Sequence, residues 1–118
     1  MDTADLIAID THTRLEVSCR NPFDNYGEEF DRAADKYFKS SRRPTMQETI
    51  DFYREKKIGF VNFTVDAESQ QGRRRIPNEE IAEAALANPD IMIAFGSIDP
   101  HKGRFGAREA RKLVEQYG

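Results

Sequence analysis

The stretch Leu6-Ile7-Ala8-Ile9-Asp10-Thr11-His12-Thr13-Arg14-Leu15-Glu16 decides the fold of this chain. Its apolar start, Leu6 to Ile9, is too short for a helix of ordinary length and rich in isoleucine, which predicts a strand buried on both faces. Because side chains alternate along a strand, Asp10, His12 and Arg14 are expected on one face. Thr11 and Thr13 are expected on the other face. Parallel α/β sheets carry such groups at the strand ends that form active sites. A purely structural role for the histidine is the alternative.

The rest of the chain predicts strands that alternate with helices. Apolar runs predict further strands at residues 60–65 and 91–98. Helical spacing of apolar residues predicts helices over residues 28–38, 45–58, 78–88 and 107–117. Thr45 and Glu48 form a capping box, Gly59 is the expected residue just past that helix, and Asn78 is an expected N-cap. Residues 69–75 are polar and basic and are expected to form a loop.

This order predicts an α/β fold with right-handed crossovers, a parallel sheet and a helical insert after the first strand. The 118 residues are enough for a single domain with one core. Three parallel strands make a narrow sheet, so we expect residues 1–118 to be the front part of a larger α/β domain. The alternative is a complete, open three-stranded domain, either as a monomer or as a dimer.

Composition narrows the class of protein. Charged residues make up 33% and hydrophobic residues 38%, and the net charge of −3 argues against nucleic acid as the main partner. Cys19 is the only cysteine, so neither a disulfide framework nor a thiolate zinc cluster is expected. The acidic N-terminus does not look like a signal peptide, and no apolar run approaches a membrane span. We expect a cytoplasmic protein that binds no membrane.

Polar side chains follow each of the three predicted strands, and both histidines lie among them. The three groups are Asp10, His12, Arg14 and Glu16; Thr64, Asp66 and Glu68; and Ser97, Asp99 and His101. Imidazole and carboxylate suit zinc, manganese or iron, but a guanidinium has no lone pair to donate, so Asp10 and His12 are the ligand candidates of the first strand. Glycine-rich dinucleotide and phosphate motifs are missing from the sequence. The run at residues 73–75 fits a solvated basic loop better than an anion site.

The run Ile9-Asp10-Thr11-His12-Thr13-Arg14-Leu15-Glu16 resembles the opening strand of the amidohydrolase superfamily, in the amidohydrolase-related branch that includes aminocarboxymuconate-semialdehyde decarboxylase. That strand typically reads Asp-x-His-x-His. Gly96-Ser97-Ile98-Asp99-Pro100 is similar to the third strand end of the same branch. The resemblance covers the whole chain but only the first three βα units of a TIM-type (β/α)8 barrel.

The resemblance implies a metal-dependent hydrolase or non-oxidative decarboxylase for a small carboxylate or cyclic substrate, with Zn or Mn as cofactor. His12 matches its first metal ligand, Asp10 is a further candidate, and Arg14 replaces the second ligand. Arg14, Asp99 and His101 are then the candidates for substrate binding. The remaining ligands would lie beyond Gly118, so the isolated chain is expected to be inactive, because a catalytic metal needs about three protein ligands.

Three hypotheses follow for the chain. It is the N-terminal part of such an enzyme, a catalytically silent relative, or a small α/β interaction module whose polar strand ends are structural. The expected partners are a small-molecule substrate and either the rest of the barrel or further copies of the chain. In an unclosed barrel the apolar third strand would expose its edge, which favours association or aggregation.

Overall fold

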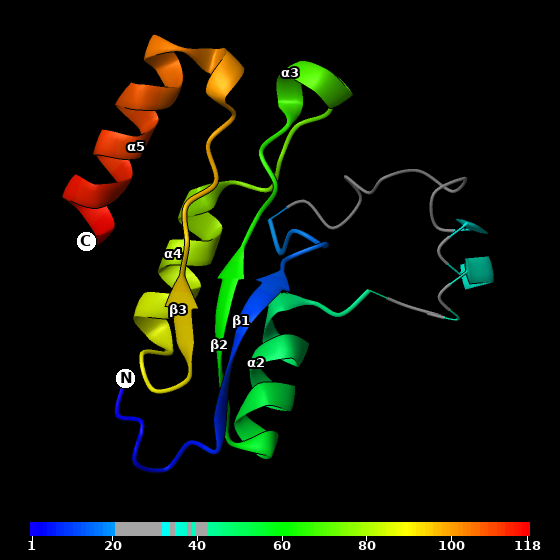
Figure 1. Cartoon of the computed structure of the whole chain (residues 1–118), viewed down its shortest axis with the longest axis vertical. Helices are drawn as coiled ribbons and strands as arrows, with labels where there is room; N and C mark the ends of the chain where they lie inside the picture. The colour runs from blue at the N-terminus through cyan, green and yellow to red at the C-terminus, as the bar shows by residue number, and fades with distance from the viewer. Residues whose placement is uncertain (21–31, 34, 38, 40–42) are drawn as a thin grey trace.

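The computed structural model describes residues 1–20, 32–33, 35–37, 39 and 43–118. Three strands form one parallel sheet in the order β1-β2-β3, with β2 in the centre (Figure 1). The strands are β1 (Ala8–Arg14), β2 (Ile58–Phe63) and β3 (Met92–Ala94). The predicted α/β fold with a parallel sheet is therefore confirmed.

The connections are helical, as the sequence predicts. They are α2 (Met46–Lys56), α3 (Glu68–Gln71), α4 (Asn78–Ala87), the short 3-10 helix η1 (Pro100–Lys102) and α5 (Arg104–Tyr117). The predicted loop at 69–75 thus begins in the short helix α3, and α5 starts three residues before the predicted position. The helix predicted over residues 28–38 falls mostly outside the described residues, of which 32–33 and 35–37 are helical.

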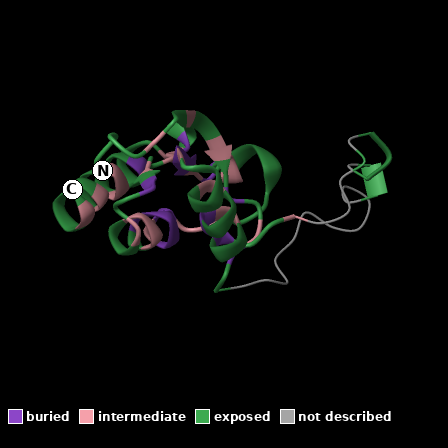
Figure 2. Ribbon diagram, turned by 90° about the horizontal axis from the view of Figure 1, so that it is seen from below, coloured by how far each residue is buried: buried purple, intermediate pink, exposed green. Residues whose placement is uncertain are grey.

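Both long crossover helices cover the same face of the sheet. Phe60 and Met92 are partners in the register of β2 and β3, so their side chains point to one side. They share a buried core with Ile50 of α2 and Ile81 of α4. Figure 2 shows the buried residues in the interior and exposed residues along the outer sides of the helices. We call this side the helix-covered face.

The opposite side, which we call the open face, is formed by Ile9, Val61, Phe63 and Ile93. Val61 at its centre is buried, but the side chains of Ile9 and Ile93 are 42% and 36% exposed. The apolar run of the opening stretch predicts a strand buried on both faces, and this prediction is wrong. Strand β1 is an edge strand, and Ile7 just before it is 76% exposed.

At the ends of α2, the predicted N-terminal capping box is confirmed and the predicted C-terminal glycine is not. Thr45 accepts a hydrogen bond from the backbone amide of Glu48, and the Glu48 carboxylate accepts one from the amide of Thr45, as the capping box predicts. The predicted role of Gly59 is wrong. Lys57 adopts the left-handed conformation with φ of 55°, and its amide bonds to the carbonyls of Arg54 and Tyr53. Gly59 lies within β2, where a Cβ would meet the Leu6 side chain at 3.0 Å.

An apolar groove runs along the free edge of β3, between α4 and α5. Its volume is about 520 Å³, and its walls include Leu86, Ile93, Phe95, Leu113 and Val114. The helix α5 packs on α4 and η1, which leaves its apolar stripe facing this groove rather than a strand. Strand β3 has three residues instead of the predicted eight, since beyond Ala94 the chain leaves the ladder toward η1.

Candidate functional site

A bulge in β1 separates the residues that the sequence places on one face. Asp10 pairs with Phe60 and Thr13 pairs with Asn62, so one extra residue is inserted between these two positions. Phe60 and Asn62 are two residues apart and share a face, and Asp10 and Thr13 therefore share the helix-covered face. The prediction that Asp10, His12 and Arg14 form one row, with Thr13 opposite, is wrong because period-two alternation fails at the bulge.

Asp10 is held on the helix-covered face by two hydrogen bonds. One carboxylate oxygen accepts the backbone amide of His12 at 3.0 Å, and the other accepts the hydroxyl of Tyr53 at 2.7 Å. These two bonds, with that of His12 the larger influence, lower the pKa of Asp10 below its ordinary value. Burial and the bond to Asp10 raise the pKa of Tyr53 to about 12. Asp10 is therefore an ionised anchor for the phenol of α2.

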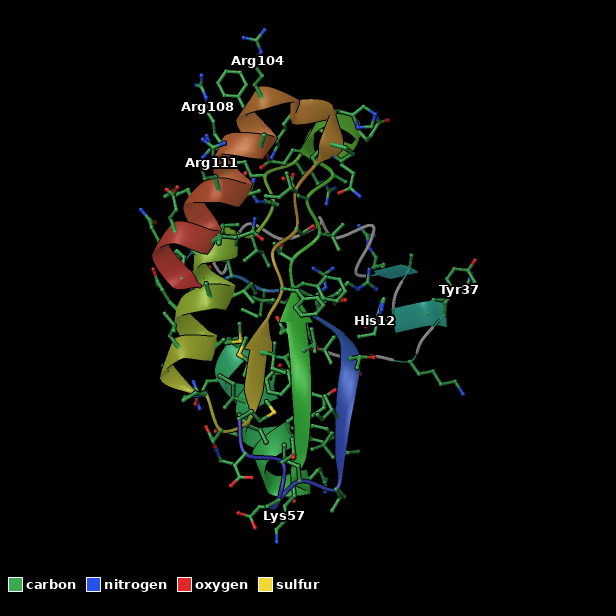
Figure 3. All side chains as sticks on the ribbon, turned by 60° about the vertical axis from the view of Figure 1, so that its left-hand side comes forward. His12, Tyr37, Lys57, Arg104, Arg108 and Arg111 are labelled. Carbon is green, nitrogen blue, oxygen red and sulfur yellow. The ribbon has the colours of Figure 1, made fainter. Side chains whose placement is uncertain are left out.

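His12 lies on the other side of the strand. Its ring packs edge-on against Phe63 of the open face, with 5.3 Å between ring centroids, and the residue is exposed (Figure 3). Among the described residues no hydrogen bond to its side chain is found. A ring in this position can bind a metal ion or exchange a proton with a ligand on the open face.

Arg14 pairs with Phe63 in the sheet register and has an exposed side chain. It contributes to a wide hollow of about 600 Å³ between the end of β1 and the first half of α2, together with Pro44, Phe52 and Tyr53. A guanidinium beside aromatic rings suits a carboxylate on a cyclic or aromatic compound. The predicted substrate role of Arg14 has room in this hollow.

The ends of β2 and β3 meet in a network of ions around Asp66. The Asp66 side chain is fully buried and accepts hydrogen bonds from the Lys102 ammonium at 2.7 and 2.8 Å and from the amide of Asp99 at 3.0 Å. Arg75 lies 3.3 Å away, and Glu68 bridges the same two cations at 2.6 and 3.7 Å. Burial alone would raise the pKa values of Asp66 and Glu68, but the bonds from Lys102 hold both below their ordinary values.

Asp99 is buried beside this network and joins two connections. It accepts hydrogen bonds from the amide and the hydroxyl of Ser69, and from the amide and ring Nδ1 of His101. The bonds from Ser69 come first among the causes that hold the pKa of Asp99 far below its usual range. The His101 side chain itself is 61% exposed. Asp99 thus caps η1 and the start of α3, while His101 keeps a free ring edge.

The three strand ends do not converge on one site. Side chains from the ends of β2 and β3 are bonded to one another, but within the described part of the chain none of them bonds to Asp10, His12 or Arg14. No group of three or more histidine, cysteine or acidic side chains in that part is placed to hold a metal ion. Since Asp10 turns away from His12 and Arg14 cannot ligate, the described residues offer one metal ligand on the open face.

Two buried polar residues, Asn78 and Glu80, were not identified from the sequence as parts of this end of the sheet. Asn78, the expected N-cap, instead accepts the amide of Ser97 and donates to its carbonyl, each at 2.8 Å. Glu80 is buried in α4, where it accepts the hydroxyl of Ser18 at 2.7 Å and the amide of Cys19 at 2.6 Å. Their position at the start of α4, beside polar neighbours, gives no sign of these distant partners.

No helix among the described residues combines the length and the apolar character needed to cross a membrane. Comparison of the chain with protein-family models, with curated proteins and with solved structures finds no match.

Proposed function

We propose that the chain supplies the first three βα units of a barrel of the amidohydrolase-related type, a metal-dependent hydrolase or decarboxylase for a small carboxylate or cyclic substrate. The observation that carries the proposal is the one-sided sheet. Both long crossover helices, α2 and α4, contact the helix-covered face, and the open face is apolar and partly exposed. In a (β/α) barrel the helices lie outside and the other face of every strand points inward.

The free edges of the sheet support the same proposal. Parallel sheets are normally buried on both sides, yet among the described residues β1 and β3 each pair with β2 alone, and Ile9 and Ile93 are exposed. The groove beside β3 is lined by apolar residues of β3, α4 and α5. A fourth parallel strand laid against β3 would cover this groove and bury the stripe of α5, as a continuing barrel requires.

Within such a barrel, this chain would contribute His12 and Arg14. The bulge in β1 turns His12 to the inner side at the strand end where barrel active sites form. Arg14, which pairs with Phe63 of the same face, would bind and orient a substrate carboxylate. The described residues do not fit a complete metal site, because His12 stands alone on its face. We therefore assign no metal-dependent step to this chain by itself.

The alternative function is a small α/β interaction module without chemistry of its own. It is favoured by the network around Asp66, in which every carboxylate already has a cation, as expected of a structural cluster. As a free monomer, such a module would have to stay folded with its open face and strand edges exposed to solvent.

Dye binding tests whether the groove beside β3 is uncovered in the folded chain, as the barrel proposal requires. A barrel sector with an uncovered groove is expected to bind 8-anilinonaphthalene-1-sulfonate in its folded state, and Phe95→Ser in the groove should reduce that fluorescence. Phe105→Ser, on the solvent side of α5, is the matched control and should leave it unchanged. A folded chain that binds no dye and exchanges the amides of β3 slowly would contradict the barrel proposal.

A further inference from the structure

The outer side of α5 carries an unusual row of cations. Arg104, Arg108 and Arg111 are all exposed and project away from the body of the molecule (Figure 3). Within the described residues none of the three has an acidic partner, whereas Lys112 on the same helix pairs with Glu79 at 3.0 Å. Phe105 lies in this row with 75% of its surface exposed, under the guanidinium of Arg108 at 5.9 Å. We call these residues the basic stripe.

The outer side of α2 carries the opposite charge in the same arrangement. Glu48, Asp51 and Glu55 are exposed and lie at helical spacing on one face. Phe52 stands among them with 53% of its surface exposed. We call these residues the acidic stripe. Each stripe therefore has three charges of one sign and one exposed phenylalanine, and the acidic stripe also holds the Lys56 ammonium, 3.3 Å from Glu55 and 5.8 Å from the centre of the Phe52 ring.

The two stripes match in register when the helices run antiparallel. From Arg104 the next cations follow after four and then three residues, and backward from Glu55 the acids follow after four and then three residues. Each stripe is therefore about 10 Å long at the rise of an α-helix. The match pairs Arg104 with Glu55, Arg108 with Asp51 and Arg111 with Glu48. It also brings Phe105 and Phe52 within about one helical turn of each other.

Within one chain the stripes cannot meet, because α5 and α2 lie on opposite sides of the molecule (Figure 1). They can meet only between two copies. The contact also has a favourable dipole arrangement. Arg104 and Arg108 stand in the first half of α5, where positive charge opposes the helix dipole, and acids from a neighbouring helix would offset that cost.

We propose that copies of this chain associate head to tail, with the basic stripe of one copy against the acidic stripe of the next. The proposal does not rest on the barrel function, although Glu48 and Phe52 of the acidic stripe also line the hollow beside Arg14, which a second copy docked there would cover. The contact is heterologous, so it produces rings or open chains of copies rather than only dimers. Exposed ion pairs are individually weak and are screened by salt, so association is expected at high protein concentration and low ionic strength.

Charge reversal tests the proposal by sedimentation velocity. The first variant combines Arg104→Glu with Arg108→Glu, and the second combines Asp51→Lys with Glu55→Lys. Glu48 is left in place because it belongs to the capping box of α2. Each exposed pair contributes up to about fivefold in affinity, so either variant alone, with two pairs lost, should associate up to about 25-fold more weakly than the parent.

Mixing the two variants gives the decisive result. The reversed α5 of the first variant then faces the reversed α2 of the second, and association should return in the mixture. Arg73→Glu with Arg74→Glu changes the net charge equally at exposed loop positions and should leave association intact. For the parent, association should disappear at about 1 M NaCl, where the screening length is about 3 Å.

Three outcomes would overturn the proposal. The first is a parent chain that stays monomeric at low salt and high concentration. The second is association that both variants retain but that Ile93→Lys abolishes, which would place the contact at the edge of β3. The third is a mixture that associates no better than its two components, with both variants shown to be folded by circular dichroism.

Discussion

The hydroxyl of Tyr53 in α2 donates a 2.7 Å hydrogen bond to the carboxylate of Asp10 in β1, 43 residues away. This bond ties the first crossover helix to the edge strand, two residues before the strand bulges and turns His12 to the open face. The same ring of Tyr53 stacks on Phe60 at 4.5 Å between centroids, which places the bond at the border of the core. The position of His12 therefore depends on how Asp10 is held.

Tyr53→Phe should remove this bond while keeping the stacked ring. Because the acceptor is a carboxylate at the rim of the core, we expect a loss of about 1 kcal/mol in the free energy of unfolding, measured by urea denaturation at neutral pH. Tyr117→Phe is the matched control, since the Tyr117 hydroxyl makes only a 3.5 Å exposed contact with Glu83. Equal stabilities of the two variants would show that the bond to Asp10 contributes nothing.

The sequence could predict the alternation of strands and helices because each element has its own periodicity and end signals. The capping box at Thr45 and Glu48 lies within four residues and forms as expected. The burial of the first strand could not be predicted in the same way. An apolar run such as Leu6 to Ile9 is the same in a central strand and in an edge strand, and only the neighbours decide between them.

The candidate site was harder to predict for a related reason. The bulge between Asp10 and Thr13 has no glycine or proline to mark it, yet it moves His12 to the opposite face. The ion network joins Asp66 to Lys102 across 36 residues, and no local pattern announces a partner at that distance. Local propensity therefore predicts elements, whereas side-chain partners depend on how those elements pack.

Lys102→Met should destabilise the chain strongly. The variant leaves the fully buried carboxylate of Asp66 with Arg75 as its remaining cation, so we expect a loss of about 2 to 3 kcal/mol in the free energy of unfolding. Lys112→Met breaks the exposed pair with Glu79 and should have no measurable effect. The comparison by urea denaturation at pH 7 checks both, and similar losses for the two variants would contradict a buried role for Lys102.

The same network should set the acid limit of stability. The pKa values of Asp66 and Glu68 are lowered on folding despite burial, through Lys102, so the unfolded chain binds more protons in acid. Their contribution is complete above the ordinary values of 3.8 and 4.5 and is lost as the pH falls through the lower folded values. Urea midpoints measured from about pH 5 to pH 2 should therefore decrease, and less steeply for Lys102→Met.

Stability at high pH should be limited by groups whose pKa is raised on folding. Hydrogen bonds to Asp66 and Glu68 outweigh burial and raise the pKa of Lys102, and burial with the bond to Asp10 raises that of Tyr53 to about 12. Groups with raised folded pKa values stabilise the fold below their ordinary values, here 10.5 and 10.0, and lose that contribution as the pH rises through the folded values. Urea midpoints should decrease above about pH 10, and an unchanged midpoint at pH 11 would contradict this expectation.

Arg14→His should create a zinc site that the parent lacks. Position 14 pairs with Phe63, the residue whose ring contacts His12, so a histidine there would lie near His12 at the end of β1. Two imidazoles on alternate positions of one strand end share a face and are a strong pair of zinc ligands, whereas His12 with Arg14 is not. We expect zinc bound to the variant after dialysis, measured by plasma mass spectrometry, and little in the parent.

The control for this experiment is His12→Ala in the Arg14→His background, which should lose the metal again because only one imidazole remains. Near-stoichiometric zinc in the parent would show that His12 already has ligand partners. It would disprove the statement that the metal site of this chain is incomplete. If neither chain binds zinc, position 14 does not face His12, and the match between this strand and the Asp-x-His-x-His pattern loses its physical basis. Retention of zinc in the double variant would place the metal away from β1, with His101 as the next imidazole to replace.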